Sequence, residues 1–412
     1  MDNQKNNPQI RFATYSDEWV QQKMLDCIAK ITDFRGRTPK KLGMDWSESG
    51  YLAFSALNVK DGYIDFSQDV HYGNQELYDK WMGGNELHQG QVLFTTEAPM
   101  GNVAQVPDNN KYILSQRVIA FTPKETLISE KFLATVLRSA PVFSKLTSLS
   151  SGGTAKGVSQ KALSNVELFF PSNPKEQNQI ALLFAKLDEL IANSQDKYDK
   201  LCVLKDTMIG QLFPKADTTT PSVRFDGFTA PWIRRHASEL FTEFSDRGFP
   251  ELPVLSATQS SGMVIRDELG KNISHELANE VGYKRVLPGQ FVIHLRSFQG
   301  GFAHSDIEGI TSPAYTVFGF AEPQMHCHYF WKYVFSSKSF IRRLESVTYG
   351  IRDGRSISYE EFLALDFLCP SKKEQEKIAQ FMLSLDSLIF LHKKEKDKLQ
   401  TLRKTLFEKM FV

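Results

Sequence analysis

Two stretches of the chain gather positively charged side chains beside hydroxyls and glycine. From 144 to 161, SKLTSLSSGGTAKGVSQK holds three lysines and no acid. From 337 to 358, SKSFIRRLESVTYGIRDGRSIS holds five lysines and arginines against two acids, so each stretch carries a formal charge of +3. Because Lys and Arg bind phosphate oxygens, and because hydroxyls and backbone N–H groups add hydrogen bonds, this composition is typical of contacts to a nucleic acid backbone.

Individual residues in and near these stretches are candidates for reading bases. Arg pairs with guanine through two parallel hydrogen bonds, so we expect Arg352 and Arg355 to contact base edges. Gln116 and Arg117 are further candidates for this task in the first half of the chain. The other candidate DNA-binding residues lie within the two basic stretches: Lys145, Thr154, Lys156, Ser159, Arg342, Arg343 and Ser356. The alternative, that these are solvated loops capping the adjacent helices, stays open for each residue.

Signatures of catalysis are incomplete wherever they begin. Gly152–Gly157 has P-loop spacing, but Val158 stands where the phosphate-binding Lys is required, and His275-Glu276 lacks the second zinc-binding His. His326-Cys327-His328 has no second ligand cluster at zinc-finger spacing, so we interpret it as a strand with a buried Cys. Neither a GxSxG elbow nor the Asn/Asp-Pro-Pro-aromatic motif of adenine methyltransferases occurs. The sequence therefore predicts a non-catalytic chain with no metal and no cofactor of its own.

One amphipathic segment occurs twice and must position the basic stretches. KEQNQIALLFAKLDELI at 175–191 and KEQEKIAQFMLSLDSLI at 373–389 lie 198 positions apart, and the match resumes up to Phe213 and Phe411. A duplication explains this repeat. Each copy starts with a capping-box signal, Asn173 or Ser371 followed three residues later by Glu. We therefore expect two long helices, over 173–213 and 371–412, and a repeat of about 39 residues at about 1.5 Å per residue makes a rod of roughly 58 Å.

Apolar residues in each copy recur in alternating steps of three and four, the heptad pattern of a coiled coil. The predicted interface consists of Ile180, Leu187, Leu190, Leu201 and Leu204 in the first copy and Ile378, Leu385, Leu388, Leu399 and Leu402 in the second. Polar residues interrupt both seams midway, forming either a polar layer that fixes the register or a partly solvated stretch: Ser194 and Tyr198, and His392 and Lys396. Each copy can cover the apolar stripe of the other. Because related halves joined in tandem most easily arrange themselves about a pseudo-twofold axis, we expect an antiparallel pair, while a parallel pair stays open.

Outside the helices the sequence changes to short runs of Phe, Tyr, Val and Ile broken by Gly, Pro, Asn and Asp, which is typical of mixed α/β domains. The expected order is a first domain over 1–172, a helix over 173–213, a second domain over 214–370 that opens with a linker at 214–225, and a helix over 371–412. Echoes such as GQVLF at 90–94 and GQFVI at 289–293 indicate one fold with two different surfaces. The predicted fold class is α+β.

Composition limits where a nucleic acid site can be. The formal net charge of +1 over 412 residues gives no chain-wide attraction to nucleic acid or to a membrane, so a basic site has to be local. The four cysteines lie far apart, and no run of 18 apolar residues occurs. These features predict a reduced, cytoplasmic protein without membrane contact.

The duplicated helix with its KEQ start, the two dissimilar domains that precede its copies, and the endings GGTAKGVS and GIRDGRSIS resemble the specificity subunits of Type I restriction–modification systems. The resemblance covers essentially the whole chain. It implies that each domain is a target recognition domain that reads one half of a bipartite site in double-stranded DNA, while the helices set the spacer and bind methyltransferase (M) subunits. Restriction and translocation (R) subunits would complete the complex, and S-adenosylmethionine, ATP and Mg²⁺ would belong to these partners.

Two other interpretations stay open. A duplicated coiled coil could display two protein-binding domains without any DNA, or the chain could be an enzyme with an unrecognised site. The paired basic stretches favour DNA binding over the scaffold, and the incomplete motifs disfavour the enzyme.

Overall fold

The chain divides into two compact units. This computed structural model describes residues 7–151, 156–215, 218–258, 261–269, 277–294, 301–347 and 358–412, with the backbone alone at 277–279 and 345–347. Unit 1 consists of Met1–Asp196 together with Lys393–Val412, and unit 2 consists of Lys197–His392. Each unit therefore contains one globular part and segments of both copies of the repeat.

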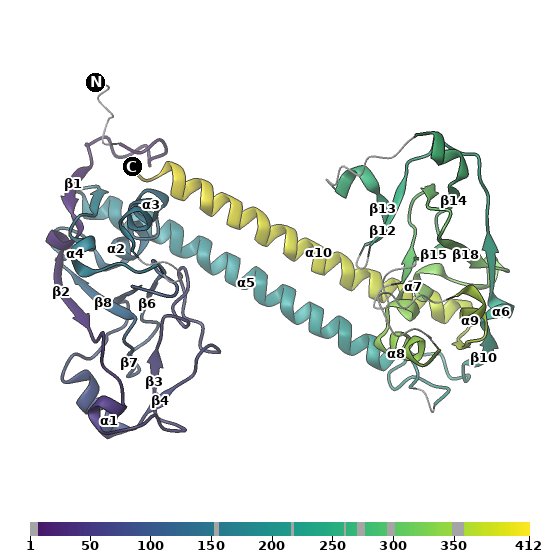
Figure 1. The fold of residues 1–412 in the computed structure, drawn as a ribbon, viewed down its shortest axis with the longest axis horizontal. Coiled ribbons are helices and arrows are strands. Elements are labelled where there is room, and N and C mark those ends of the chain that lie inside the picture. The colour runs from purple at the N-terminus through teal and green to yellow at the C-terminus, as the bar shows by residue number, and fades with distance from the viewer. Residues whose placement is uncertain are drawn as a thin grey trace. The chain divides into compact units, whose positions relative to one another are not determined.

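The two copies of the repeat form the longest elements of the chain (Figure 1). Helix α5 runs over Pro174–Leu212 and helix α10 over Lys372–Lys409, which are 39 and 38 residues. Both starts are capped, because Asn173 Oδ1 accepts a hydrogen bond from Lys175 N at 3.0 Å and Ser371 Oγ accepts one from Glu374 N at 3.4 Å. The prediction of two long duplicated helices is confirmed.

In unit 1 the helices run antiparallel. The ring of Phe184 stacks on Phe407 with 4.0 Å between centroids. Further along α5, Gln195 Oε1 accepts a hydrogen bond from Lys396 Nζ at 3.0 Å. Later residues of α5 therefore contact earlier residues of α10. Ser194 is also buried here, at 4% exposure. The polar residues in the middle of the seam are therefore part of the helix contact in this unit.

The same direction holds in unit 2. Lys205 Nζ lies 2.5 Å from Asp386 Oδ1, and Leu212 at the end of α5 shares a core with Ile378 near the start of α10. The predicted antiparallel pairing is thus observed within each unit.

The seam itself differs from the prediction at alternate positions. Ile180, Leu187, Ile378 and Leu385 are buried and Leu201 and Leu399 half-buried, but Leu190, Leu204, Leu388 and Leu402 are exposed by 38, 42, 43 and 47%. The residue after each exposed Leu turns inward instead: Ile191, Lys205, Ile389 and Arg403. The prediction was wrong at Leu204 and Leu402 because the next residues are cations held by ion pairs, which a hydrophobic pattern does not reveal. It was wrong at Leu190 and Leu388 because the Ile that follows each of them fits the heptad equally well.

The aromatic tips of the helices complete the cores of both units. In unit 1, the ring of Phe411 at the end of the second repeat copy lies 6.1 Å from the ring of Trp19 and 6.1 Å from the ring of Phe132, measured between centroids. In unit 2, Phe213 at the end of the α5 copy packs 6.4 Å from Trp232 and 5.4 Å from Phe330. The repeat therefore ends in Phe both times because each globular core uses that ring.

Unit 1 is built on a four-stranded antiparallel sheet in the order β2-β8-β5-β6, beside a smaller sheet β4-β3-β7 and the pair β1-β9. Its strands are β1 Val20–Lys23, β2 Ile28–Asp33, β3 Tyr51–Phe54, β4 Tyr72–Gly73, β5 Val92–Thr95, β6 Val103–Gln105, β7 Ile113–Leu114, β8 Val118–Pro123 and β9 Glu167–Phe170. Its other helices are η1 Met24–Cys27, η2 Lys40–Leu42, α1 Gln75–Met82, α2 Glu130–Val136, α3 Ala140–Leu149 and α4 Gln160–Leu163.

Unit 2 repeats this plan with the antiparallel sheet β11-β18-β15-β16 and the pairs β10-β19, β12-β13 and β14-β17. Its strands are β10 Ile233–His236, β11 Phe241–Phe244, β12 Leu255–Thr258, β13 Gly262–Ile265, β14 Lys284–Val286, β15 Phe291–Ile293, β16 Phe302–His304, β17 Gly309–Thr311, β18 Thr316–Phe320 and β19 Asp366–Cys369. Its other helices are α6 Ala237–Leu240, η3 Arg266–Leu269, η4 Leu277–Gly282, η5 Pro323–Met325, α7 His328–Ser336, α8 Lys338–Val347 and α9 Tyr359–Leu363.

The short sequence echoes occupy equivalent places. GQVLF supplies β5 and GQFVI supplies β15, each the third strand of its four-stranded sheet. Both strands are buried at every residue, because alternate side chains of each strand belong to two different hydrophobic clusters, one with the domain helices and one with the smaller strands. The predicted α+β class, with two mixed domains and a duplicated antiparallel helix pair, is confirmed.

One local prediction is wrong. Cys327 is the residue before helix α7 and does not lie in a strand, and Phe330, Trp331 and Tyr333 of that helix are buried. Burial of aromatic side chains overrides their β propensity here. All four cysteines are free thiols: Cys27, Cys202, Cys327 and Cys369.

Among the helices that the structure describes, none combines the length and the apolar character that a membrane crossing requires.

Candidate nucleic-acid interface

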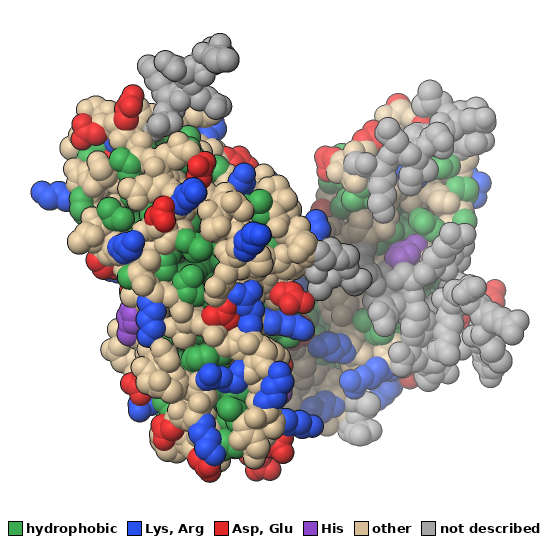
Figure 2. All heavy atoms as spheres, turned by 60° about the vertical axis from the view of Figure 1, so that its left-hand side comes forward, with side chains coloured by type: hydrophobic (Ala, Val, Ile, Leu, Met, Phe, Trp, Pro, Cys, Tyr) green, Lys and Arg blue, Asp and Glu red, His purple; other side chains and the backbone are tan. Residues whose placement is uncertain are grey.

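Charged side chains of both signs cover the visible face of unit 1 (Figure 2). The predicted contacts of the first basic stretch divide among three elements. Lys145 is exposed on α3, Lys156 is exposed before α4, and Ser159 Oγ accepts a hydrogen bond from Ala162 N at 3.1 Å as the N-cap of α4. Thr154 lies outside the described residues. Ser159 thus has a structural task, while the two lysines present their ammonium groups to solvent.

Gln116 and Arg117 occupy the turn between β7 and β8. Arg117 has an exposed side chain, and its carbonyl oxygen accepts a hydrogen bond from Thr96 N at 2.9 Å. The carbonyl of Thr96 in turn accepts from Val158 N at 2.9 Å. Thr96 therefore connects the Gln116–Arg117 turn to the segment that carries Lys156.

A basic turn that the sequence analysis missed follows β2. Residues 35–41, RGRTPKK, hold Arg35, Arg37, Lys40 and Lys41 with no acid. Arg35, Lys40 and Lys41 are exposed and Arg37 is half-buried. A count over a shorter window would have found this turn, because four of its seven residues are cations.

The basic turn is tied to α4. Arg35 Nε donates to Asp33 Oδ2 at 2.8 Å, and Gln160 Nε2 donates to the same oxygen at 2.8 Å. Burial alone would raise the pKa of Asp33, but the hydrogen bonds from Arg35 outweigh it, so this pKa lies below its ordinary value. The ionised carboxylate therefore fixes the basic turn against the segment that carries Lys156.

The candidates of unit 2 fall largely on α8 or outside the described residues. Arg342 is exposed on α8, whereas Arg343 Nη2 donates to Asp366 O at 2.5 Å and its guanidinium lies 5.5 Å from the ring centre of Phe367. Arg343 thus supports the packing of α8 on β19. Arg352, Arg355 and Ser356 lie outside the described residues.

The turn of unit 2 that corresponds to the basic turn of unit 1 has a different charge. After β11 the sequence SDRGFPE contains one cation and two acids. Gly248 takes a φ of +89°, as Gly36 takes +79° in unit 1, which only glycine adopts without strain. The guanidinium of Arg285, paired with Glu308, lies over Phe249 at 4.5 Å. The same turn is therefore basic in unit 1 and near neutral in unit 2.

A stacked histidine pair lies in unit 2, in which His304 is buried and His328 is half-buried. His304 Nε2 and His328 Nδ1 are 2.8 Å apart and their rings stack. Burial lowers the pKa of His304 to about 3 and also lowers the pKa of His328. In the described part of the chain no three His, Cys, Asp or Glu side chains come together as metal ligands. The pair is therefore a neutral element of the core.

In each unit, an Arg–Glu ion pair of the same type attaches the globular part to a long helix. In unit 1, Arg11 Nε donates to Glu176 Oε1 at 2.6 Å, and in unit 2, Arg224 Nε donates to Glu374 Oε1 at 2.7 Å. Each Glu is 1% exposed. The next residue of each helix, Gln177 or Gln375, accepts from a backbone N–H at the start of a domain helix. The KEQ motif thus provides the same attachment twice.

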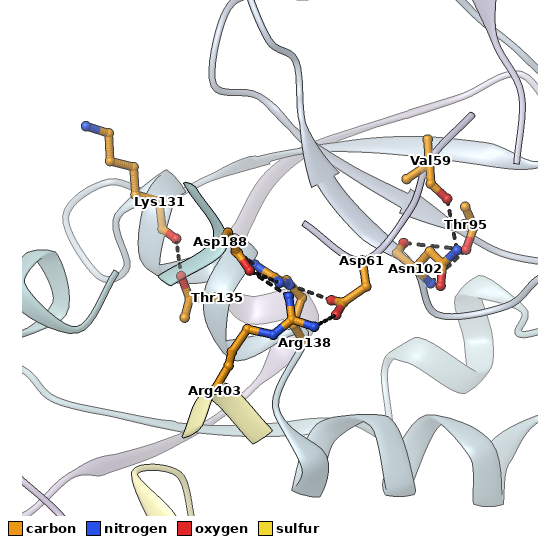
Figure 3. A network of polar contacts seen from close by, with 9 residues as sticks. All are labelled: Val59, Asp61, Thr95, Asn102, Lys131, Thr135, Arg138, Asp188 and Arg403. Carbon is orange, nitrogen blue, oxygen red and sulfur yellow. Dashed lines mark hydrogen bonds and ion pairs between the residues drawn. The ribbon is translucent and has the colours of Figure 1, made fainter. Parts of the chain in front are cut away.

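A second attachment differs between the units. In unit 1, Asp188 of α5 accepts hydrogen bonds from Arg138 at 2.6 Å and from Arg403 of α10 at 2.6 Å, and Asp61 binds both arginines (Figure 3). Burial alone would lower the pKa of Arg138, but Asp188 and Asp61 outweigh it and raise that pKa. This network joins a domain loop, the end of α2 and both helices.

In unit 2 the equivalent acid is Asp386. It binds Lys205, the equivalent of Arg403, at 2.5 Å, and it accepts a hydrogen bond from Tyr333 Oη at 2.6 Å. Burial and this bond raise the pKa of Tyr333. The acid and the cation on the helices are retained, while a Tyr hydroxyl replaces the buried guanidinium.

Comparison with known proteins supports the family indicated by the sequence. Residues 17–202 match the model of the Type I restriction modification DNA specificity domain. The Type I restriction enzyme MjaIX specificity subunit of Methanocaldococcus jannaschii is 30% identical over 113 residues, which are 27% of this chain and 25% of that protein. The matched segment thus spans about a quarter of that relative.

The fold also resembles that of a solved structure. The crystal structure of the Type I restriction–modification system S subunit from M. genitalium superposes with a TM-score of 0.64 at 15% identity, covering 98% of this chain and 99% of the other. This likeness concerns the fold. The resemblance to Type I specificity subunits is confirmed.

Proposed function

Because residues 17–202 carry a Type I restriction modification DNA specificity domain, we propose that the chain is the sequence-reading subunit of a Type I restriction–modification complex. Unit 1 and unit 2 each read one half of a bipartite site in double-stranded DNA. The chain recognises the DNA sequence, and methylation and cleavage are carried out by partner subunits that hold S-adenosylmethionine, ATP and Mg²⁺.

One observation carries this proposal. The two units share a sheet order and the Arg–Glu attachment, yet the turn after the first strand of the sheet is basic in one and near neutral in the other. A duplicated scaffold with unlike surfaces suits a protein that recognises two different short sequences, because contacts to base edges specify and shared contacts only position.

The helices provide the second part of the proposed function. Long helices are stiff, so they set the spacer between the two half-sites. On the helices of unit 1, Leu182 is 69% and Leu402 47% exposed, and in unit 2, Val203 is 67% and Leu391 57% exposed. Exposed apolar side chains on amphipathic helices are typical of helix docking, and we propose that methyltransferase subunits bind here, with restriction subunits joining the assembly.

Exchange of one domain tests the proposal. Residues 1–172 are replaced by the equivalent domain of a related chain, and methylated adenines are then mapped in cells that express the complex. We expect one half of the methylated sequence to change while the other half and the spacer stay the same. The reciprocal exchange of 214–370 serves as the matched control and should change the other half. An unchanged sequence after both exchanges would refute the assignment.

A further inference from the structure

Unit 1 contains a cavity of about 250 Å³ between the basic turn, the segment before β3 and the β7–β8 turn. Its walls include Arg37, Lys40, Asp45, Trp46, Trp81 and Gln116. From the sequence, Gln116 was predicted to read bases, whereas no such prediction was made for the basic turn. The fold brings the two together on one side of the unit.

The walls of this cavity are rigid. Trp46 stacks on His71 with ring centroids 5.4 Å apart, and the buried Trp81 donates from Nε1 to Leu114 O at 2.8 Å. Arg37 donates to the carbonyl of Trp81 and its guanidinium lies 4.5 Å from the ring centre of Phe34. Arg37 is thus committed to the wall, and the aromatic surface is fixed before any ligand arrives.

Besides Arg37 and the exposed Asp45, the cavity presents the side chains of Gln116 and Lys40. Gln116 is half-buried, and no other residue in the described part of the chain hydrogen-bonds to its side-chain amide. Lys40 is exposed at the rim, and the neighbouring Lys41 Nζ donates to Gly36 O at 2.6 Å, which helps to hold the turn. The side-chain amide of Gln116, which offers a donor and an acceptor, therefore lies beside an aromatic wall and the exposed Lys40.

This combination matches an A·T base pair. In the major groove, adenine presents N7 as acceptor and the N6 amino group as donor, which a Gln amide binds through two hydrogen bonds. The thymine methyl of the same pair suits an apolar wall such as Trp46. Lys40 at the rim suits a phosphate. This contact adds affinity but carries no sequence information.

We propose that Gln116 reads an adenine in the half-site of unit 1, that Trp46 contacts the paired thymine methyl, and that Lys40 binds a neighbouring phosphate. This inference rests on the proposed function and names residues that would determine its specificity. It assigns base reading in unit 1 to the β7–β8 turn and assigns only backbone contacts to the stretch that carries Lys145 and Lys156.

The test is selection from randomised DNA by the full-length chain assembled with its methyltransferase partners. The variant Gln116→Ala should lose preference for A·T at one position of one half-site, by at least about fivefold, while the other half-site is selected as before. Gln116→Glu should shift that position toward cytosine, because a carboxylate accepts from the cytosine amino group. A residue with only a structural role would not produce such an exchange of bases.

Two further variants separate reading from positioning. Lys40→Ala should weaken binding to selected and random DNA alike and reduce the slope of log K against log salt by about one. Gln68→Ala, a change at an exposed glutamine of unit 1, is the control and should leave selection unchanged. If Gln116→Ala and Gln116→Glu select the wild-type sequence, this inference is overturned and the proposed function stands. If the wild-type assembly selects no sequence at all, both are overturned.

Discussion

The two attachments of the repeat in unit 1 and unit 2 have diverged to different extents. The Arg–Glu pair at the start of each helix is the same in both, with N–O distances of 2.6 and 2.7 Å. About three turns of helix further on, Asp188 binds two arginines in unit 1, whereas Asp386 binds one lysine and one tyrosine in unit 2. The helix side of each contact was retained after duplication, and the domain side was replaced. The contacts to the helices therefore constrain each domain, whereas the contacts that each domain makes elsewhere can differ.

The charges on the helices also favour one pairing direction. In the observed antiparallel arrangement Asp188 meets Arg403, and Lys205 meets Asp386. A parallel arrangement of equivalent residues would place Asp188 beside Asp386 and Lys205 beside Arg403. Like charges at close range are destabilising, so these four residues select the antiparallel pair.

The largest expected effect concerns the register of the seam in both units. Phe184→Ala should destabilise the chain by about 4 kcal/mol and Met382→Ala by about 3 kcal/mol, because each leaves a cavity at a fully buried position. Leu190→Ala and Leu388→Ala should each change the free energy of unfolding by about 0.5 kcal/mol or less, since both side chains are exposed. Urea denaturation followed by circular dichroism measures all four. Equal losses at the buried and the exposed positions would contradict the observed register.

The next effect is the difference between the two junctions. Asp188→Ala should cost about 3 kcal/mol, because Arg138, whose side chain is 7% exposed, then keeps only part of its compensating charge. Asp386→Ala should cost about 1 kcal/mol, because Lys205 is 29% exposed and can be hydrated. Denaturant midpoints of the two variants give the comparison.

The shared attachment provides the control for that difference. Arg11→Met and Arg224→Met should each cost about 3 kcal/mol, since either change leaves a Glu that is 1% exposed without its cation. Unequal losses here, or equal losses for Asp188→Ala and Asp386→Ala, would show that the junctions do not differ as their contacts indicate.

The smallest effect is a pH dependence confined to unit 2. The pKa of His304 is lowered to about 3, whereas an unfolded His titrates near 6.5, so between these values the unfolded chain binds the proton and the folded chain does not. Stability should therefore fall by about 2 kcal/mol as the pH drops from 7 to 5. Asp306 opposes this shift, whereas His328 and Lys332 add to it.

The variant His304→Gln isolates this contribution. It should flatten the pH dependence of the urea midpoint between pH 7 and 5, whatever it does to stability at pH 7. An unchanged slope in His304→Gln would show that another group titrates in this range.

Local sequence patterns predicted the elements that depend on them. The duplicated helices, their capped starts and the aromatic tips at Phe213 and Phe411 all follow from residue spacing. The seam was placed wrongly at Leu190 and Leu388 because Ile191 and Ile389 fit the heptad equally well, and only tertiary contacts decide between them.

Other features depend on contacts between distant residues and could not be predicted. Arg343 donates a hydrogen bond to Asp366 O, which lies 23 positions away, and no sequence pattern indicates this contact. Cys327 was placed in a strand, yet it precedes helix α7, whose aromatic side chains are buried. The basic turn at 35–41 was legible in the sequence and was overlooked because its net effect vanishes over longer windows.

The central claim is that one chain reads two separate half-sites. Mapping of methylated adenines across the genome of the host, with and without this chain, tests it most directly. We expect a motif of two unlike short blocks separated by a fixed number of unspecified bases, with one methylated adenine in each block, that disappears when the chain is deleted. A single uninterrupted motif, or methylation that persists without the chain, would contradict the account.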